Sequence, residues 1–176
     1  SLLQLTNGEF QTSPSWSAAR NLIFFSAFGS SALFSITPSG SDLRQWPWAD
    51  RSGIAAPSSF PNSDTLSVFT MLNSGYCLAI QYPDDTLITS ILACGFSWLW
   101  SSRASPDGSV IAFNANYAGD PVSNLYLFNR ADQSLERLNT KASEGMDFSP
   151  DGMQLVHADL GVVYEDPRYA DQRGTR

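Results

Sequence analysis

The sequence contains very few of the residues that usually cover exposed helix faces. Only four Glu and one Lys occur among its charged side chains, against 13 Asp and nine Arg. Glu and Lys are good helix formers, whereas Asp favours turns and helix caps. We therefore predict an all-β chain, and its 176 residues are enough for one well-buried core in a single domain.

Clustered positive charge and long apolar runs are also missing. The net charge is −7 at pH 7, and no basic stripe is present that could neutralise phosphates, so we expect no nucleic-acid partner. No apolar run approaches the ~20 residues that a membrane helix needs, so we expect no membrane insertion.

The residues needed for catalysis are scarce as well. The chain has one histidine, His157, and no Gly-x-Ser-x-Gly elbow or phosphate-binding glycine loop. The carboxylate pairs Asp84-Asp85 and Glu165-Asp166 consist of adjacent residues, whose side chains point to opposite faces of a strand, so we interpret them as solvated turn charges. We expect no catalytic residues and no cofactor, and we interpret His157 as a packed strand residue.

Metal ligands and cysteines are equally few. The spacing of Cys77 and Cys94 matches no metal motif, and a lone histidine makes a zinc site improbable, so no metal is expected. We expect two free thiols buried in strands. A disulfide is the alternative and would suit an oxidising compartment. The polar loop 114–124 holds several oxygen atoms, which leaves a calcium site as the alternative to an ordinary hairpin connection.

What the chain does contain is a repeat. Ser-Pro-Asp-Gly occurs twice, and similar apolar alternations follow two earlier positions, with spacings of 43, 45 and 44 residues between the four anchor residues Ser17, Phe60, Ser105 and Ser149. Apolar residues recur six and eight residues after the anchors, except that His157 stands eight residues after Ser149, and a second apolar run and a turn follow. Three or four short strands in about 44 residues are typical of one blade of a β-propeller.

The Ser-Pro-Asp-Gly segments have a structural explanation. Gly accepts positive φ, the Asp side chain can bond nearby backbone amides, and Pro does not continue a strand ladder. We therefore predict tight turns rather than ligand sites, formed by Ser105, Pro106, Asp107, Gly108, Ser149, Pro150, Asp151 and Gly152. The apolar residue before the anchor, Trp16 or Phe148, is expected to end the innermost strand and to wedge between blades.

Two stretches resemble the WD-like propeller repeat of the TolB family. "LQLTNGEFQTSPSWS" (3–17) is similar to its Leu-Thr to Trp-Ser segment, and residues 105–139 are similar to a whole blade. The first repeat departs from the pattern, with Ala18-Ala19-Arg20 in place of Pro-Asp-Gly. The resemblance implies four-stranded antiparallel blades, about four blade equivalents in the chain, and no particular function.

The predicted blades span 7–48, 49–92, 93–139 and 140–176, and the Leu-Thr strand at 1–6 is expected to complete a last blade. That blade belongs either to the same chain or to a partner chain. Three arrangements stay open: an unusually small ring, a ring shared by two chains as a homodimer, or part of a longer propeller.

Tryptophans give the best indication of a binding surface. Phe96, Trp98 and Trp100 are expected to alternate onto one face of a strand. These rings either fill the space between blades or line the mouth of the channel, with Arg103 or Arg20 nearby, because Trp and Arg are enriched in binding hot spots. The candidate partner-binding residues are Trp46, Trp48, Trp98, Trp100 and Arg103.

The sequence therefore favours a non-enzymatic scaffold that binds a protein or peptide through its loops and central funnel, in the periplasm, on the cell surface or outside the cell. One alternative is a propeller module of a larger, peptidase-like enzyme whose catalytic domain is absent from this chain. Another is a carbohydrate-binding propeller that uses its tryptophans.

Overall fold

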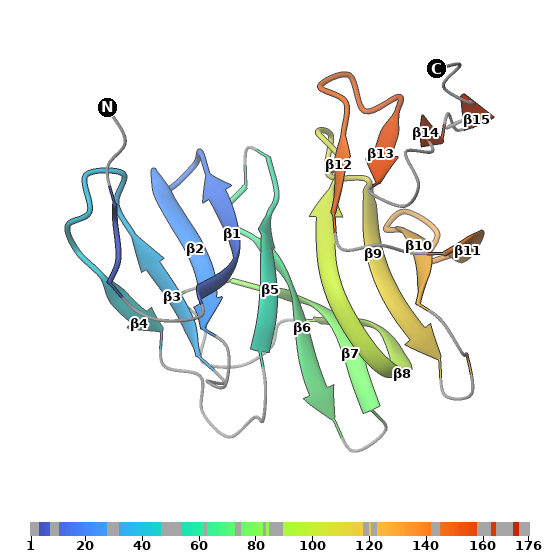
Figure 1. Cartoon of the computed structure of the whole chain (residues 1–176), viewed down its shortest axis with the longest axis horizontal. Helices are drawn as coiled ribbons and strands as arrows, with labels where there is room; N and C mark the ends of the chain where they lie inside the picture. The colour runs from blue at the N-terminus through green and yellow to red at the C-terminus, as the bar shows by residue number, and fades with distance from the viewer. Residues whose placement is uncertain are drawn as a thin grey trace. The chain divides into compact units, whose positions relative to one another are not determined.

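The structure of the chain is a computed structural model (Figure 1). It describes residues 4–7, 11–27, 32–46, 54–61, 63–72, 75–82, 84, 90–117, 120, 123–141, 145–157, 163–164 and 171–172. All secondary-structure elements in these residues are β-strands, as predicted. The described residues contain no helix that is long and apolar enough to span a membrane. The chain divides into two compact units, Ser1–Cys94 and Gly95–Arg176.

The first unit begins with a four-stranded antiparallel sheet of consecutive strands. Its members are β1 (Gln11–Ser17), β2 (Leu22–Ala27), β3 (Leu33–Ile36) and β4 (Arg44–Trp46), and Figure 1 shows them side by side in blue and cyan. Three consecutive residues of β2, Phe24 to Ser26, are buried. Both faces of this central strand are therefore covered, since successive side chains point to opposite faces.

The second sheet of this unit also follows chain order. It contains β5 (Ile54–Ser59), β6 (Leu66–Leu72), β7 (Gly75–Gln81) and the first residues of β8 (Ser90–Ala104). Five consecutive residues of β6, from Leu66 to Thr70, are buried. A run of buried residues of this kind indicates a strand that is covered on both faces of its sheet.

The second unit repeats this architecture. The remainder of β8 pairs with β9 (Val110–Tyr117), followed by β10 (Asn124–Asn129) and β11 (Leu135–Lys141). Another four-stranded sheet contains β12 (Met146–Phe148), β13 (Leu155–His157), β14 (Val163–Tyr164) and β15 (Asp171–Gln172). All the pairings within these two sheets are antiparallel.

Each unit has an apolar core between consecutive sheets. In the first unit Phe24, Leu33 and Trp46 form a buried cluster with Leu66, Val68 and Ala79. In the second unit the cluster consists of Ala112, Leu125, Met146 and Leu155, with Leu127, Leu138 and Phe148 packed against it. Complete burial of a side chain the size of Phe contributes about 1.5–3 kcal/mol, so these clusters hold neighbouring sheets together.

The N-terminal segment differs from its prediction. The described residues Gln4–Asn7 form no strand, and a Cβ placed on Gly40 would lie 3.5 Å from Leu5 Cδ2. Gly40 follows β3 in the first sheet. Leu5 therefore packs on the first sheet, and the described part of the segment adds no strand to a last blade. An apolar side chain is stabilised wherever it covers exposed apolar surface, and strand pairing is only one way to do so.

The two cysteines form a disulfide, so the expectation of free thiols is wrong. Cys77 lies in β7 and Cys94 in β8, with Cα atoms 4.1 Å apart. No sequence pattern indicates this pairing, because the proximity arises only when β8 lies beside β7. The bond closes a loop with a sequence separation of 17 residues.

The disulfide is expected to stabilise the first unit measurably. We predict that replacing both cysteines, Cys77→Ala with Cys94→Ala, lowers the free energy of unfolding by about 3 kcal/mol, because the unfolded chain gains entropy when the loop is opened. Urea denaturation followed by circular dichroism measures this change. Addition of a thiol reductant should destabilise the original protein and leave the double variant unaffected; equal sensitivity of the two proteins would contradict the prediction.

Candidate functional site

Both Ser-Pro-Asp-Gly segments form tight turns with the same hydrogen bonds. In the first turn the Ser105 hydroxyl and the Ser109 amide donate to Asp107 Oδ1, at 2.6 and 3.0 Å. In the second turn the Ser149 hydroxyl donates to Asp151 Oδ1 at 2.5 Å, and the amide two residues further on donates to the same oxygen at 3.0 Å. Each carboxylate accepts hydrogen bonds from donors of its own turn, as expected if these segments are turns and not ligand sites.

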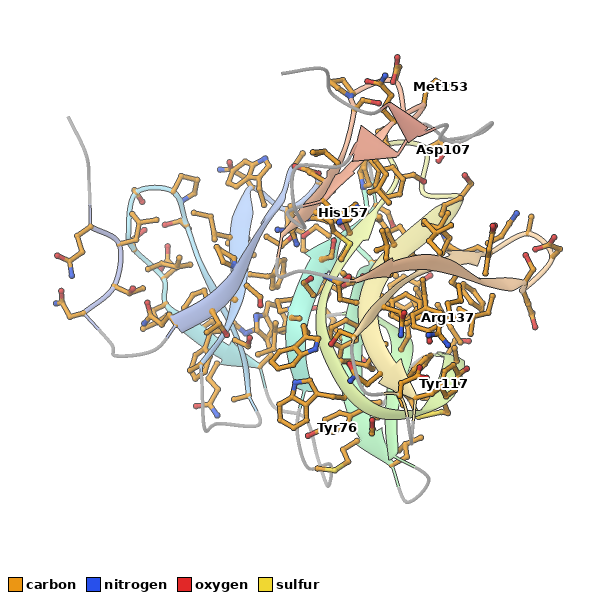
Figure 2. All side chains as sticks on the ribbon, turned by 45° about the vertical axis from the view of Figure 1, so that its right-hand side comes forward. Tyr76, Asp107, Tyr117, Arg137, Met153 and His157 are labelled. Atoms are coloured by element: carbon orange, nitrogen blue, oxygen red, sulfur yellow. A yellow bond between two sulfur atoms is a disulfide. The ribbon has the colours of Figure 1, made fainter. Side chains whose placement is uncertain are left out.

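The glycines and prolines of these turns also have a geometric role. Gly108 and Gly152 have φ of +73° and +72°, a region that L side chains rarely adopt. A Cβ on Gly152 would lie 3.4 Å from Pro106 Cδ, so the two turns are neighbours. Figure 2 agrees, since Asp107 and Met153 are labelled beside each other. The repeat thus brings equivalent turns to the same edge of the second unit.

The hydrogen bonds change the acidity of both aspartates. The bond from the Ser105 hydroxyl, with those from Ser109, holds the pKa of Asp107 below its ordinary value of 3.8. The Ser149 hydroxyl and the Met153 amide lower the pKa of Asp151 in the same way. Both carboxylates are therefore charged acceptors at neutral pH, which suits a turn and not a general acid.

The first repeat also has a turn at this position, residues 18–21, but an ion pair takes the place of the aspartate hydrogen bonds. Arg20 donates to Asp84 at 2.7 Å and lies 3.5 Å from Asp64, so a cation joins two acidic turns of the following repeat. The hydrogen bond from Arg20 lowers the pKa of Asp84. Asp84 thus has a definite partner, whereas Asp85 and the Glu165-Asp166 pair lie outside the described residues.

Trp46 is not on the surface, which corrects its prediction as a partner-binding residue. It is 3% exposed, and its indole Nε1 donates to Ser35 Oγ at 3.0 Å. The Arg44 guanidinium carbon lies 3.8 Å from the centre of the ring. The indole is enclosed by its own sheet and the following one, because β4 presents this position to the apolar cluster. Trp48 lies outside the described residues.

Trp98 and Trp100, in contrast, are exposed beside each other. Their side chains are 44% and 47% exposed, and their ring centres lie 5.3 Å apart with planes inclined by 61°. Phe96 does not share their face as expected, since it is 1% exposed. The pairing of β8 with β9 shifts register between Phe96 and Trp98 and again between Leu99 and Ser102, and such bulges change the face to which a side chain points.

Polar side chains hold this tryptophan pair in place. Trp100 Nε1 donates to Ser123 Oγ at 2.8 Å, and the Ser123 hydroxyl donates to Asn116 Oδ1. Asn116 lies in β9 and is the register partner of Trp98, so the chain of hydrogen bonds links the Trp100 indole to the residue of β9 that lies opposite Trp98. The sequence places Asn116 and Ser123 in the polar loop 114–124 but does not connect them with the tryptophans, because only the pairing of β8, β9 and β10 brings them together.

An aromatic cluster anchors β8 from its buried face. Phe96 packs against Phe113, Tyr117 and Tyr126, with ring centres 5.4, 4.6 and 5.7 Å away. Tyr126 is 1% exposed, and its hydroxyl has no hydrogen-bond partner within the described part of the chain. Burial raises the pKa of Tyr126, so the hydroxyl remains protonated.

A small ionic network lies at the edge of the same sheet. Arg137 is 3.5 Å from Asp120 and donates to Asn124 Oδ1 at 3.0 Å. Asp120 and Asn124 belong to the polar loop 114–124, for which a calcium site is the alternative to an ordinary hairpin connection. The Asn124 amide donates to Asp120 at 3.3 Å, so these oxygens have protein partners. Among the residues that the structure describes, no group of three potential metal ligands occurs.

The remaining candidate residues lie in strands. Arg103 is half-buried in β8 and donates to the Ser102 carbonyl at 2.8 Å. His157 ends β13 and is 3% exposed, as expected of a packed strand residue. Trp16, expected to wedge between blades, is instead 49% exposed. Of the predicted binding residues that the structure describes, only Trp98 and Trp100 therefore form an exposed pair.

The fold and this site can be compared with known proteins. No protein-family model matches the chain, and no curated protein is similar in sequence. Among solved structures, TolB from Acinetobacter baumannii matches with a TM-score of 0.75 and 14% identity, over 96% of this chain and 45% of that one. The putative TolB from Agrobacterium tumefaciens matches with a TM-score of 0.73 and 13% identity, over 96% and 62% of the two chains. A luciferin-regenerating enzyme matches with a TM-score of 0.66 and 13% identity, over 93% and 59%.

These similarities define the architecture. The chain has a β-propeller fold built of antiparallel sheets. More narrowly, the fold is that of the TolB-like propellers, as the resemblance of the repeats implies. The chain spans about half the length of these solved structures. At sequence identities of 13–14%, these similarities support the assignment of the fold and do not support the assignment of a function.

The turn carboxylates lead to a prediction about stability and pH. Asp107→Ala removes the acceptor of three donors, so we expect the free energy of unfolding to fall by about 1 kcal/mol at pH 7. Because the folded pKa is depressed, this contribution exists above the unfolded value of 3.8 and is lost as the pH falls below it. Urea unfolding at several pH values measures the effect. Glu136→Ala is the control, and a deficit that is equally large at acidic pH would contradict the role of the charge.

The buried hydroxyl of Tyr126 leads to another prediction. Because a buried polar group without a partner costs free energy, Tyr126→Phe should leave stability unchanged or raise it by up to about 1 kcal/mol. Thermal unfolding of the two proteins tests this. A clear loss of stability in the variant would mean that the hydroxyl has a partner in the folded protein.

Proposed function

We propose that this chain is a non-enzymatic binding propeller that engages a protein or peptide partner through Trp98 and Trp100. One observation carries the proposal: two adjacent indoles on β8 are each nearly half exposed and lie in contact with each other, and one of them, Trp100, is held by a hydrogen bond to Ser123. Single exposed apolar side chains are common, but adjacent exposed apolar groups often mark interaction sites, and tryptophan is enriched in binding hot spots. Because the pair is already ordered, binding loses little side-chain entropy.

The arrangement of the rings favours a peptide over a sugar. A pyranose stacks on a flat aromatic surface, whereas these two planes are inclined by 61° and form a stepped surface. An apolar side chain fits such a step, and the peptide groups beside it can bond with the polar side chains that surround the indoles. Ser97 and Asn116 belong to that surrounding, joined by a 3.1 Å bond from the Ser97 hydroxyl to the Asn116 carbonyl.

The disulfide supports a location in an oxidising compartment. Disulfides such as Cys77–Cys94 persist in the periplasm, on the cell surface and outside the cell. A partner in one of these compartments is therefore the one to look for.

A second candidate function is that of a propeller module within a larger enzyme. It is favoured by the share of the solved structures that the chain covers, 45–62%, and by the fact that one of these structures is a luciferin-regenerating enzyme. An open reading frame that continues past Arg176 into a catalytic domain would support this candidate, and a stop codon directly after Arg176 would count against it.

The binding proposal predicts the effect of removing the indoles. Peptides selected from a random library against the immobilised protein should bind the double variant Trp98→Ala, Trp100→Ala at least about 30-fold more weakly, which corresponds to about 2 kcal/mol. Titration calorimetry measures the dissociation constants. A glycan array run in parallel tests the carbohydrate alternative.

Trp16 provides the matched control, since it is also a strand tryptophan and is 49% exposed. Trp16→Ala should leave the selected peptides bound with unchanged affinity. Equal losses in the two variants, or binding of glycans but of no peptide, would overturn the proposal.

A further inference from the structure

The tryptophan pair lies on strands that carry no charge of their own. β9, β10 and β8 as far as Ser102 contain no Lys, Arg, Asp or Glu. Arg103, the next residue of β8, is half-buried and donates to the Ser102 carbonyl at 2.8 Å. The carboxylate of Asp120, in the loop between β9 and β10, is 3.5 Å from Arg137, so these two charges offset each other. Beyond them the chain has an excess of negative charge, −7 at pH 7, and the field of such a chain attracts cationic partners.

The hydrogen bonds beside the pair run in one direction and end on an acceptor. The Trp100 indole donates its single N–H to Ser123 Oγ, and the Ser123 hydroxyl donates to Asn116 Oδ1. An amide oxygen has two lone pairs, and among the described residues Asn116 Oδ1 receives this one hydrogen bond. Trp100 therefore offers a partner its ring faces and no donor, and Asn116 offers an acceptor. A group that fits here has to donate hydrogen bonds and to favour the face of an aromatic ring.

The two rings are close enough to share one cation. The face of an indole carries a partial negative charge, and a cation is attracted to it when it lies within about 6 Å of the ring centre. The ring centres of Trp98 and Trp100 are 5.3 Å apart, so a group that enters the step between the rings can lie within this distance of both. Each indole is nearly half exposed, so a partner can reach the step from the solvent.

Trp46 shows what an indole held in this way contacts within the same chain. Its N–H donates to a serine hydroxyl, Ser35 Oγ, as that of Trp100 donates to Ser123. The guanidinium carbon of Arg44 lies 3.8 Å from the centre of the Trp46 ring, a close stacking contact. Among the described residues no Lys or Arg lies over the ring of Trp100 in this manner. The face of Trp46 thus has an arginine from its own sheet, whereas that of Trp100 is open to an arginine from a partner.

We infer that the tryptophan pair binds an arginine side chain of the partner peptide. This inference rests on the proposed function and names the chemistry of its ligand. The aliphatic stem of arginine supplies the apolar contact that the step between the rings accepts. Its planar guanidinium stacks on an indole and has N–H donors for Asn116 Oδ1. A carboxylate would meet ring faces that repel it and an indole N–H that is already donated to Ser123.

Peptides selected from a random library against the original protein give the first test. They should be enriched in arginine, and replacement of that arginine by citrulline, which is neutral and of the same shape, should weaken binding at least about fivefold. For the double variant Trp98→Leu, Trp100→Leu the same replacement should change the affinity less than about twofold, because leucine keeps apolar area but has no aromatic face. Titration calorimetry measures the affinities, and circular dichroism verifies that the variant is folded.

The outcomes separate this inference from the proposed function. Selected peptides that need both tryptophans, but contain no arginine or bind equally well with citrulline, would overturn the inference and leave the proposed function standing. Selected peptides that bind the double variant as tightly as the original protein would overturn both.

A small probe tests the site without a selected peptide. N-acetylargininamide should shift the indole N–H signals of Trp98 and Trp100 in the NMR spectrum of the nitrogen-15-labelled protein, and N-acetylcitrullinamide at the same concentration should shift them less. Trp16 is the matched control, because it is 49% exposed and no second described indole lies against it, so its signal should respond more weakly to the arginine probe. Equal shifts with the two probes, or an equal response of Trp16, would overturn the inference.

Discussion

Apolar packing between the faces of consecutive sheets is the interaction on which this molecule depends. A strand points its side chains alternately to two faces, and a four-stranded sheet with two apolar faces is not stable alone. Phe24 and Val68, both fully buried, show how one sheet is covered by the next in the first unit. Ala112 and Leu155 do the same in the second. The repeat is the consequence of this requirement, since each added sheet covers one face and exposes another.

The turns make that packing regular. The hydroxyl oxygens of Ser105 and Ser149 accept hydrogen bonds from the backbone amides five residues later. The same hydroxyls donate to the aspartate two residues after each serine, which closes the turn. In the third and fourth repeats these short turns place the second strand within one residue of the same offset, so equivalent apolar residues reach equivalent faces. Where the motif is absent, Arg20 joins the first repeat to the acidic turns of the second through an ion pair.

The proposed binding surface is separate from the core and yet positioned by it. The buried Phe96 cluster fixes β8, and two register shifts then direct Trp98 and Trp100 outward. Function in such folds resides in a few side chains placed on a common scaffold. Aromatic side chains that are already ordered lose little conformational entropy on binding, so a strand is a better support for such a surface than a mobile loop.

The sequence by itself determined the all-β class, the repeat and the two Ser-Pro-Asp-Gly turns. Each of these is set by residues within a few positions of one another, through propensity, alternation and local hydrogen bonds. Only the tertiary structure decided which tryptophans are exposed: Trp46 is enclosed by the following sheet, whereas bulges in β8 expose Trp98. It also joined Cys77 to Cys94 and laid Leu5 on the first sheet. These outcomes depend on strands that meet only in the folded chain, and no local pattern encodes such a meeting.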